Sequence, residues 1–390
     1  MRTARNYLAK EIYRSSAVVL VALLGLFSFF TLVDELDSVS ERFPISALLS
    51  LELLAIPTRL YDLLPIGLLI GSILALAGLA QRNELVILRI SGLSSMGILR
   101  MLWVIALPVV VLAILLSEVI TPSAEMRYSE ANLLLRGRVE GGRLTSGYWF
   151  KEPTVNGGTR IINVGKLLSS GEVADLKVYE FPDNTRMSSM WASPSAVFVG
   201  NKLILKDVTE NRFADNAAQG LVDGEPADSP MMVVARETQV EIDTTLTPAR
   251  LVSRILTPER MSWLMLNDYI EYLERNQLEA DRQIVAIWRK VAYPFTLIVM
   301  LTIAAPISYM QTRRGGVGAK IFIGILMGTG FFMLNQLALN IGLLYKWPPI
   351  VTALLPNTLA MMIALSTIYA MENRLKWSGR KLQSSIGANA

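Results

Sequence analysis

The sequence predicts an α-helical integral membrane protein with six transmembrane helices and an all-β domain inserted between the third and the fourth. Two observations lead to this fold class. Of the 390 residues, 52% are hydrophobic and only 18% are charged, which is more apolar than a soluble chain of this length requires. Six nearly uncharged runs also approach or exceed the roughly 20 residues that cross about 30 Å of hydrocarbon as a helix.

We expect the transmembrane helices in these apolar runs, which are residues 17–33, 63–80, 101–117, 291–312, 321–345 and 347–371. The first run follows four basic residues between Arg2 and Arg14 and therefore resembles a signal peptide. It is longer than the usual signal-peptide core, and it leads into the acidic "DELD" without a cleavage site of small residues. We interpret it as an uncleaved anchor.

Positive charges set the expected orientation, because Lys and Arg in short loops stay on the cytoplasmic side of a membrane. They gather in four regions, which are the N-terminus, the loop with Arg82, Arg89 and Arg100, the loop with Arg313, Arg314 and Lys320, and the tail from Arg374 onward. If six helices alternate in direction, all four regions lie on one side. We therefore expect both termini in the cytoplasm and the long segment between the third and fourth runs outside.

That outside segment, residues 122–282, changes character in its middle. Between about residues 139 and 245, runs such as "RIINVG", "LKVYEF" and "MMVVARETQVEID" are rich in β-branched residues, alternate in part, and are separated by Gly, Asn, Asp and Pro. We expect about eight short strands in a sandwich or jellyroll. A helical return follows at about residues 257–282, with Thr257 and Pro258 at its start. Residues 1–121 and 283–390 then form two membrane regions of three helices each.

The residue types argue against an enzyme. The chain has no cysteine and no histidine, which excludes thiol nucleophiles, Ser-His-Asp triads and the usual zinc ligands. An intramembrane lipid-modifying enzyme would have to use a carboxylate such as Glu118, and the acids near the apolar runs lack the spacing of a catalytic pair. In "GGVGAKI", the nearest approach to a phosphate-binding loop, Ile321 replaces the required Ser or Thr. We expect no catalytic residue, metal or cofactor on this chain.

The stretch "NELVILRISG", at about residues 83–92, predicts a short cytoplasmic helix between the second and third runs. Asn83 suits the N-cap, and Gly92 suits the left-handed position after the last turn. The apolar residues exceed what a solvated loop carries, so another surface must cover them. One interpretation is an interfacial helix packed on lipid or on neighbouring helices. The other is a coupling helix that enters a groove on a cytoplasmic motor subunit, and its predicted contact residues are Glu84, Leu85, Leu88, Arg89 and Gly92.

Here the chain resembles a known family. "AQRNELVILRISGLS" is similar to the cytoplasmic coupling segment of the LptF/LptG family, the permease subunits of the lipopolysaccharide export ABC transporter of Gram-negative bacteria. "RNYLAKEIYRSS", "YDLLPIGLLIGSILALAGLA" and "SGYWFKE" also resemble that family, so the resemblance covers nearly the whole chain. "LNDYIEYLERNQLEADRQIVAIWRKVAYPF" and "YKWPPIVTALLPN" favour its LptG branch over the LptF branch.

The resemblance implies a function and a set of partners. It implies six spans with a periplasmic β-jellyroll domain, in the bacterial inner membrane. An LptF-like chain would face this one across a cavity for lipopolysaccharide, and a cytoplasmic ATPase dimer would bind ATP and Mg and supply the work. Periplasmic bridge proteins of the LptC and LptA kind would receive the lipid, and nucleic acid has no part. The alternatives are the paralogous LptF-like subunit and a mechanotransmitting ABC membrane protein, which moves an external domain without passing a substrate.

An anionic lipid with many acyl chains needs cations at the outer membrane boundary and apolar helix surfaces below them. The candidate cations are Arg59, Arg127, Arg136, Arg138, Arg282, Arg289 and Lys290. The alternative is that these residues snorkel to the interface or pair with acids such as Asp62, Glu118, Glu125 or Asp281. The candidate apolar contacts, which ordinary helix packing would equally explain, are Leu26, Phe30, Phe331 and Leu334. Some family members carry lysines near the outer end of the first span, where this chain has "FFTLVDELDS".

Overall fold

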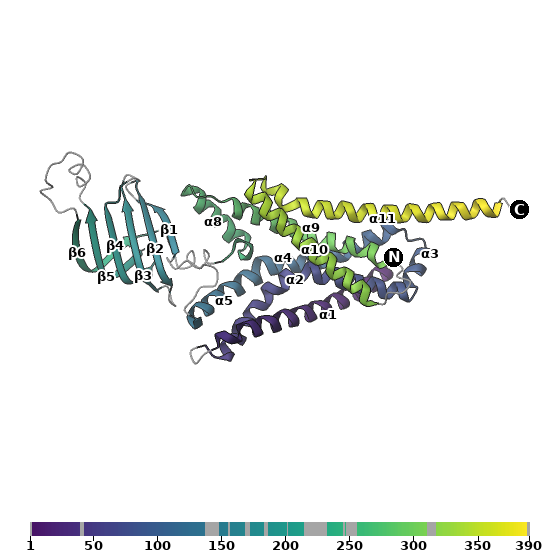
Figure 1. Ribbon diagram of the computed structural model, residues 1–390, viewed down its shortest axis with the longest axis horizontal. Helices are drawn as coiled ribbons and strands as arrows, with labels where there is room; N and C mark the ends of the chain where they lie inside the picture. The colour runs from purple at the N-terminus through teal and green to yellow at the C-terminus, as the bar shows by residue number, and fades with distance from the viewer. Residues whose placement is uncertain are drawn as a thin grey trace.

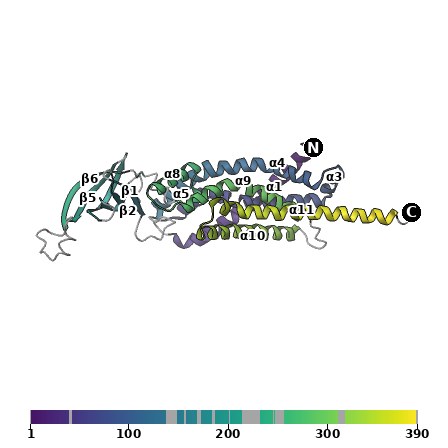
Figure 2. The ribbon, with the colours of Figure 1, turned by 90° about the horizontal axis from the view of Figure 1, so that it is seen from above.

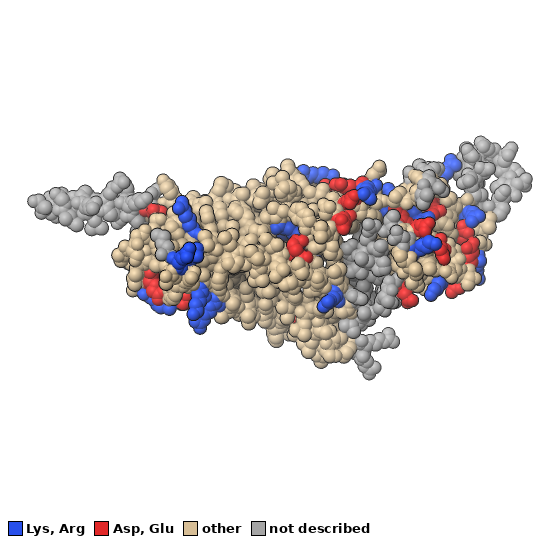
Figure 3. Space-filling model, turned by 180° about the vertical axis from the view of Figure 1, so that it is seen from behind, with Lys and Arg blue, Asp and Glu red and all other residues tan. Residues whose placement is uncertain are grey.

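The structure is a computed structural model, and it is elongated, with a helical bundle at one end and a β domain at the other (Figure 1). It describes residues 2–39, 43–136, 148–154, 157–167, 172–182, 186–200, 202–213, 232–244, 246, 256–309 and 317–387. Six helices among these residues are long and apolar enough to cross a membrane, as the sequence predicts. Figure 3 shows charged side chains at both ends of the bundle and on the β domain, with a nearly uncharged band between them.

Each of the bundle helices extends past its apolar run at one end at least. They are α1 (Arg2–Glu35), α2 (Ile45–Gln81), α4 (Ser95–Leu115), α9 (Asp281–Tyr309), α10 (Val317–Leu344) and α11 (Pro349–Gly387). A π-helical segment, η2 (Leu116–Ile120), continues α4 directly into α5 (Thr121–Arg136). The last part of α11 projects beyond the other helices, at the end of the bundle where the N-terminus lies (Figure 1).

Helix α2 is the centre of the bundle. It contains no charge between Leu63 and Ala80, and most of that stretch is buried between neighbouring helices. Its crossing with α1 is close because two glycines face α1. A Cβ at Gly67 would lie 2.3 Å from a methyl of Leu20, and one at Gly71 would lie 2.3 Å from the Cα of Ser16. Small residues let helix backbones approach in this way in membranes, where dispersion rather than hydrophobic burial holds helices together.

The insert between the third and fourth spans is all-β, which confirms the predicted fold class. It forms one antiparallel sheet in which each strand pairs with the next along the chain. The strands are β1 (Tyr148–Pro153), β2 (Thr159–Leu167), β3 (Glu172–Phe181), β4 (Ser189–Val199), β5 (Lys202–Phe213) and β6 (Met232–Asp243). We expected about eight strands, and the described residues contain these six. Figure 2 shows that the sheet is strongly curved.

Contacts around Arg160 connect the first and last strands of this curved sheet. Arg160 of β2 pairs with Glu152 of β1 and with Glu180 of β3, and Glu152 is almost fully buried. The same guanidinium donates to the backbone oxygen of Asp243 at the end of β6, at 2.7 Å. Thr244 then donates to the second carboxylate oxygen of Glu152 at 2.8 Å. The last strand is therefore brought back to the first, around an apolar core that includes Phe150, Ile162, Val178 and Leu205.

The helical return starts later than the sequence predicted. Thr257 and Pro258 open only a 3-10 turn, η4 (Pro258–Arg260), and the helix α8 (Trp263–Arg275) follows it. Met261 is fully buried and extended, with ψ at 150°, so the chain leaves the helical conformation between the two elements. The N-cap is Ser262, whose hydroxyl accepts a hydrogen bond from the backbone of Met265. Helix α8 also contacts the sheet, because the Tyr272 hydroxyl donates to the Lys151 carbonyl at 2.7 Å.

Candidate functional site

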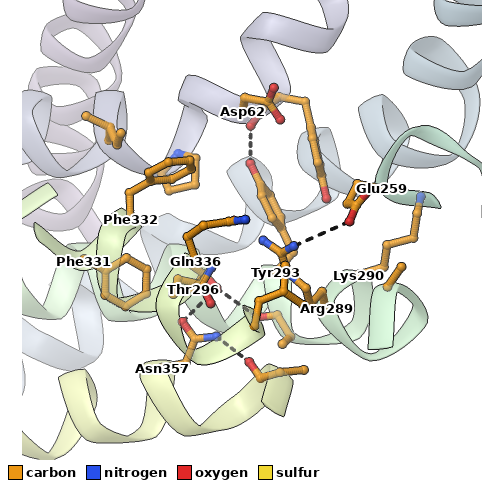
Figure 4. A pocket seen from close by; sticks show the side chains of 18 of the residues that line it. Asp62, Glu259, Arg289, Lys290, Tyr293, Thr296, Phe331, Phe332, Gln336 and Asn357 are labelled. Carbon is orange, nitrogen blue, oxygen red and sulfur yellow. Dashed lines mark hydrogen bonds and ion pairs between the residues drawn. The ribbon is translucent and has the colours of Figure 1, made fainter. Parts of the chain in front are cut away.

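A cavity of about 840 Å³ opens among α2, α9, α10 and α11, at the end of the bundle that is nearer to the β domain. Its apolar lining includes Phe27 of α1, Ile66 of α2, Met300 of α9, and Phe331 and Phe332 of α10. Figure 4 shows Phe331 and Phe332 on one side of the cavity and the charged residues on the other. The cavity is therefore amphipathic.

The charged side of the cavity carries an excess of positive charge. Its lining includes four basic side chains and two acidic ones. The basic residues are Arg260, Arg282, Arg289 and Lys290, and the acidic ones are Asp62 and Glu259. Three of the four cations come from the first turns of α9, so they lie at the end of a membrane-spanning helix, where a lipid head group would be. This distribution favours an anionic group next to an apolar one.

Ion pairs tie the turn η4 to the cavity wall. Arg260 lies 2.8 Å from the carboxylate of Asp62 on α2. Glu259 lies between two cations of α9, with an oxygen 3.7 Å from Arg282 and another 3.9 Å from Arg289. Figure 4 shows the pair with Arg289. The chain that returns from the β domain is thus connected to two helices of the bundle through charges.

Lys290 is held by the π-helical segment. Only 8% of its side chain is exposed, and its amine donates to the Ser117 hydroxyl at 2.8 Å and to Glu118 at 3.1 Å. The second oxygen of Glu118 accepts a hydrogen bond of 2.7 Å from the backbone of Trp263, the first residue of α8. A π-helical turn is a rare feature that is often found at functional sites. Here it carries both Ser117 and Glu118.

Uncharged polar contacts order the remaining wall. Thr296 of α9 donates to the amide oxygen of Asn357 on α11 at 2.9 Å, and both are buried. The rings of Tyr61 and Tyr293 are stacked with centroids 4.2 Å apart, and the Tyr293 hydroxyl donates to the backbone of α2 at Tyr61. These contacts fix the mutual position of α2, α9 and α11 around the cavity.

The structure brings only some of the predicted lipid-binding residues together. Arg282, Arg289, Lys290 and Phe331 line the cavity. Arg59 lies elsewhere, in an ion pair with Glu52. Four other candidates are exposed, which are Arg127 on α5, Leu26 and Phe30 on α1, and Leu334 on α10. The side chain of Arg136 on α5 and the whole of Arg138 lie outside what the structure describes.

Sequence reasoning did not propose Phe27, Arg260 or Glu259 as cavity residues. Phe27 adjoins the predicted Leu26 on the same helix, and only the packing of α1 decides which of the two lines the cavity. Arg260 and Glu259 lie in η4, within a segment for which the sequence predicts a helix. No periodic pattern marks such a turn, so no signal in the sequence placed it at the cavity.

The short helix α3 (Glu84–Ile90) lies at the opposite end of the bundle, near the N-terminus (Figure 1). Gly92 has φ at 93°, as predicted for the residue after the last turn. Asn83 differs from the prediction, because its φ of 58° is left-handed and an N-cap is extended. Its carbonyl accepts from the backbone of Val86 and Ile87 instead.

One face of α3 packs on the bundle and the other is open. Leu85 is buried and Leu88 packs against the bundle core. Val86, Ile87 and Ile90 are exposed, and Ile90 is 81% accessible. Glu84 lies 3.5 Å from Arg82, which in turn lies 3.5 Å from Glu11 of α1. Arg89 belongs to α3, and its side chain is outside what the structure describes.

Comparison with known proteins identifies the family. Residues 6–370 match the protein-family model described as lipopolysaccharide export system permease LptF/LptG. The chain belongs to the LptF/LptG family. The lipopolysaccharide export system permease protein LptG of Escherichia coli (strain K12) is 26% identical over 365 residues, which cover 92% of this chain and 96% of that protein. LptG of Haemophilus influenzae is 25% identical over 368 residues, which cover 93% and 97% respectively. These findings confirm the resemblance to the LptF/LptG family and to its LptG branch.

Proposed function

We propose that this chain is an LptG-like permease subunit that extracts lipopolysaccharide from the inner membrane and passes it toward the outer membrane. The observation that carries the proposal is the amphipathic cavity. Four cations and two acids line its charged side, and apolar side chains that include Phe331 and Phe332 line the opposite side. Lipopolysaccharide is likewise charged at one end and apolar at the other, since its lipid anchor carries phosphates on a head group and several acyl chains beneath.

The orientation follows from the distribution of charge. The basic N-terminus and the basic loop around α3 lie at one end of the bundle, and the positive-inside rule assigns that end to the cytoplasm. The β domain and the cavity mouth then face the periplasm. The lipid enters from the outer leaflet and leaves through the β domain, which stands next to the cavity and is connected to it by η4 and α8.

Other subunits supply the energy for transport. Helix α3 presents Val86, Ile87 and Ile90 on its open face at the cytoplasmic end. Such an apolar face on a short helix suits a groove on a cytoplasmic ATPase dimer, which would bind ATP and Mg. The exposed apolar residues of α1 and α10, such as Phe30 and Leu334, suit an LptF-like partner within the membrane. Bridge proteins of the LptC and LptA kind would receive the lipid at the β domain.

Site-specific photocrosslinking in the assembled transporter tests this function. A photoreactive residue at Phe332, which lines the cavity, should crosslink lipopolysaccharide, and ATP with Mg should reduce the yield as lipid leaves. Met362 of α11 is a matched control, because it is similarly exposed, at 59% against 55%, and does not belong to the cavity lining. Equal yields at the two positions, or a yield at Phe332 that ATP does not change, would contradict the proposed function. ATPase activity without any lipid crosslink would favour the mechanotransmitting class instead.

A further inference from the structure

The three carboxylates that pair with the cavity cations are not held equally. Asp62 is 2.8 Å from Arg260, and Glu118 is 3.1 Å from Lys290, both within hydrogen-bonding distance. Glu259 is 3.7 Å from Arg282 and 3.9 Å from Arg289, which is beyond that distance in both cases. Its carboxylate is therefore attracted by two guanidinium groups without a short bond to either of them.

Of the three carboxylates, Glu259 is also carried by the shortest backbone element. Asp62 lies inside α2, and Glu118 lies in the continuous helical rod of α4, η2 and α5. Glu259 belongs to a 3-10 turn of three residues between an extended Met261 and an extended Thr257. A turn of this length can shift its side chain without unwinding a membrane helix. Of these three carboxylates, Glu259 is thus the easiest to displace.

The two arginines form a geometry that a phosphate would also use. Arg282 and Arg289 are seven residues apart on α9, so they lie on the same face about two helical turns from each other. Both reach the one carboxylate between them, and both line the cavity. Guanidinium groups bind phosphate oxygens and carboxylate oxygens through the same charge-assisted contacts. An anion that entered the cavity would compete with Glu259 for these cations.

We propose that Glu259 is a displaceable internal anion that occupies the Arg282–Arg289 site until a lipid-borne phosphate replaces it. This inference rests on the proposed function and adds a regulated step to it. The free site stays neutralised, which limits the cost of holding two cations close together without a ligand. Binding then removes the attachment of η4 to α9, while Arg260 keeps its ion pair with Asp62 on α2. The turn is followed after two residues by α8, the helix that contacts β1 through Tyr272. Arrival of the head group is thus communicated to the β domain.

The proposal predicts a gain of affinity when the competing charge is removed. In the assembled transporter, reconstituted in phosphatidylcholine nanodiscs, Glu259→Gln should bind bisphosphorylated lipid A about twofold to fivefold more tightly than the wild type, since partly exposed ion pairs make contributions of this size. Glu259→Asp keeps the charge and should bind as the wild type does. Glu279→Gln is the matched control, because Glu279 also pairs with a cation, Lys346, but does not line the cavity.

Two further measurements separate the possible outcomes. Combining Glu259→Gln with Arg289→Gln should abolish the gain in lipid A affinity. Glu259→Gln should also raise the affinity for monophosphorylated lipid A or inorganic phosphate less than the affinity for bisphosphorylated lipid A. Unchanged or weaker lipid A binding by Glu259→Gln, in a protein that melts at the wild-type temperature, overturns the internal-anion role while leaving the transport function intact. Absence of lipid A binding by the wild type overturns the proposed function itself, and the inference with it.

Discussion

The contact between Lys290 and Glu118 gives the sharpest test of how the cavity wall is held together. Glu118→Ala removes the carboxylate that lies 3.1 Å from the amine of Lys290. The side chain of Lys290 is only 8% exposed. It also removes the acceptor of the Trp263 backbone hydrogen bond at 2.7 Å. The lysine keeps its contacts to the hydroxyl and carbonyl of Ser117 but loses its counter-charge.

The expected cost follows from these contacts. Removing one member of a fully buried pair costs about 3–5 kcal/mol, because a charge remains without compensation. Glu118 is 32% exposed and Ser117 still accepts from the amine, so solvent and hydrogen bonding reduce this cost. The lost backbone hydrogen bond to a charged acceptor adds to it. We expect a net destabilisation of about 2–3 kcal/mol.

The assay is thermal unfolding of the full chain in detergent, followed by tryptophan fluorescence at a fixed heating rate, because membrane proteins often unfold irreversibly. Glu279→Ala is the control, since its pair with Lys346 is exposed, at 85% and 70%, and should contribute less than about 0.5 kcal/mol. Adding Lys290→Met to Glu118→Ala should recover most of the loss. If Glu118→Ala and Glu279→Ala lower the melting temperature equally, the buried pair does not hold α4, α8 and α9 together as argued.

Three more predictions concern other parts of the chain. Gly71→Val should strongly reduce the yield of folded protein after detergent extraction, because its Cβ would lie 2.3 Å from the α1 backbone, while Gly25→Val, with nothing within 4 Å, should not. Arg160→Ala should accelerate hydrogen exchange in the first three strands, since the buried Glu152 loses this cation at a cost of about 2–4 kcal/mol. Ile90→Asp should lower copurification of the ATPase by about tenfold or more, because it places a charge in an apolar contact.

Each of these has its own contrary result. Lys202→Ala breaks an exposed pair in the same sheet, so equal exchange in the Lys202 and Arg160 variants would show that burial of the pair is not what matters. Ile90→Leu keeps the apolar surface of α3 and should retain the ATPase. Full ATPase binding by Ile90→Asp would favour the interpretation of α3 as an interfacial helix that rests on lipid. A normal yield of Gly71→Val would show that α1 and α2 can separate at low cost.

Much of the membrane region was predictable from local sequence. The length of an apolar run decides whether a helix can cross a bilayer, and that length is read directly from consecutive residues of the sequence. The left-handed Gly92 was predictable for a similar reason, because a residue without Cβ adopts positive φ at little cost. Asn83 was predicted less well, since it adopts either the extended or the left-handed conformation, and here the closure of the turn after α2 selects the second.

The cavity was only partly predictable. Arg282, Arg289 and Lys290 were marked by breaking the positive-inside pattern beside an apolar run. Arg59 also lies at the outer end of an apolar run, but it forms an ion pair with Glu52 on its own helix. The sequence cannot tell these cases apart, because the partner of a cation, on its own helix or on another, is set by distances of a few ångströms that only the folded chain fixes. The position of η4 at the cavity mouth depends in the same way on contacts between residues about 200 positions apart, such as Arg260 with Asp62.

Composition and hydropathy alone determined that this chain spans a membrane six times and carries a β insert, because partition into hydrocarbon and strand propensity act over short stretches of sequence. Tertiary structure alone decided which charges meet in the cavity, and that Glu259 is loosely held between two arginines while Lys290 is firmly held by Glu118. The physical reason is that Coulomb interactions and hydrogen bonds depend on distances of a few ångströms, and only the packing of α2, α4, α8 and α9 sets those distances.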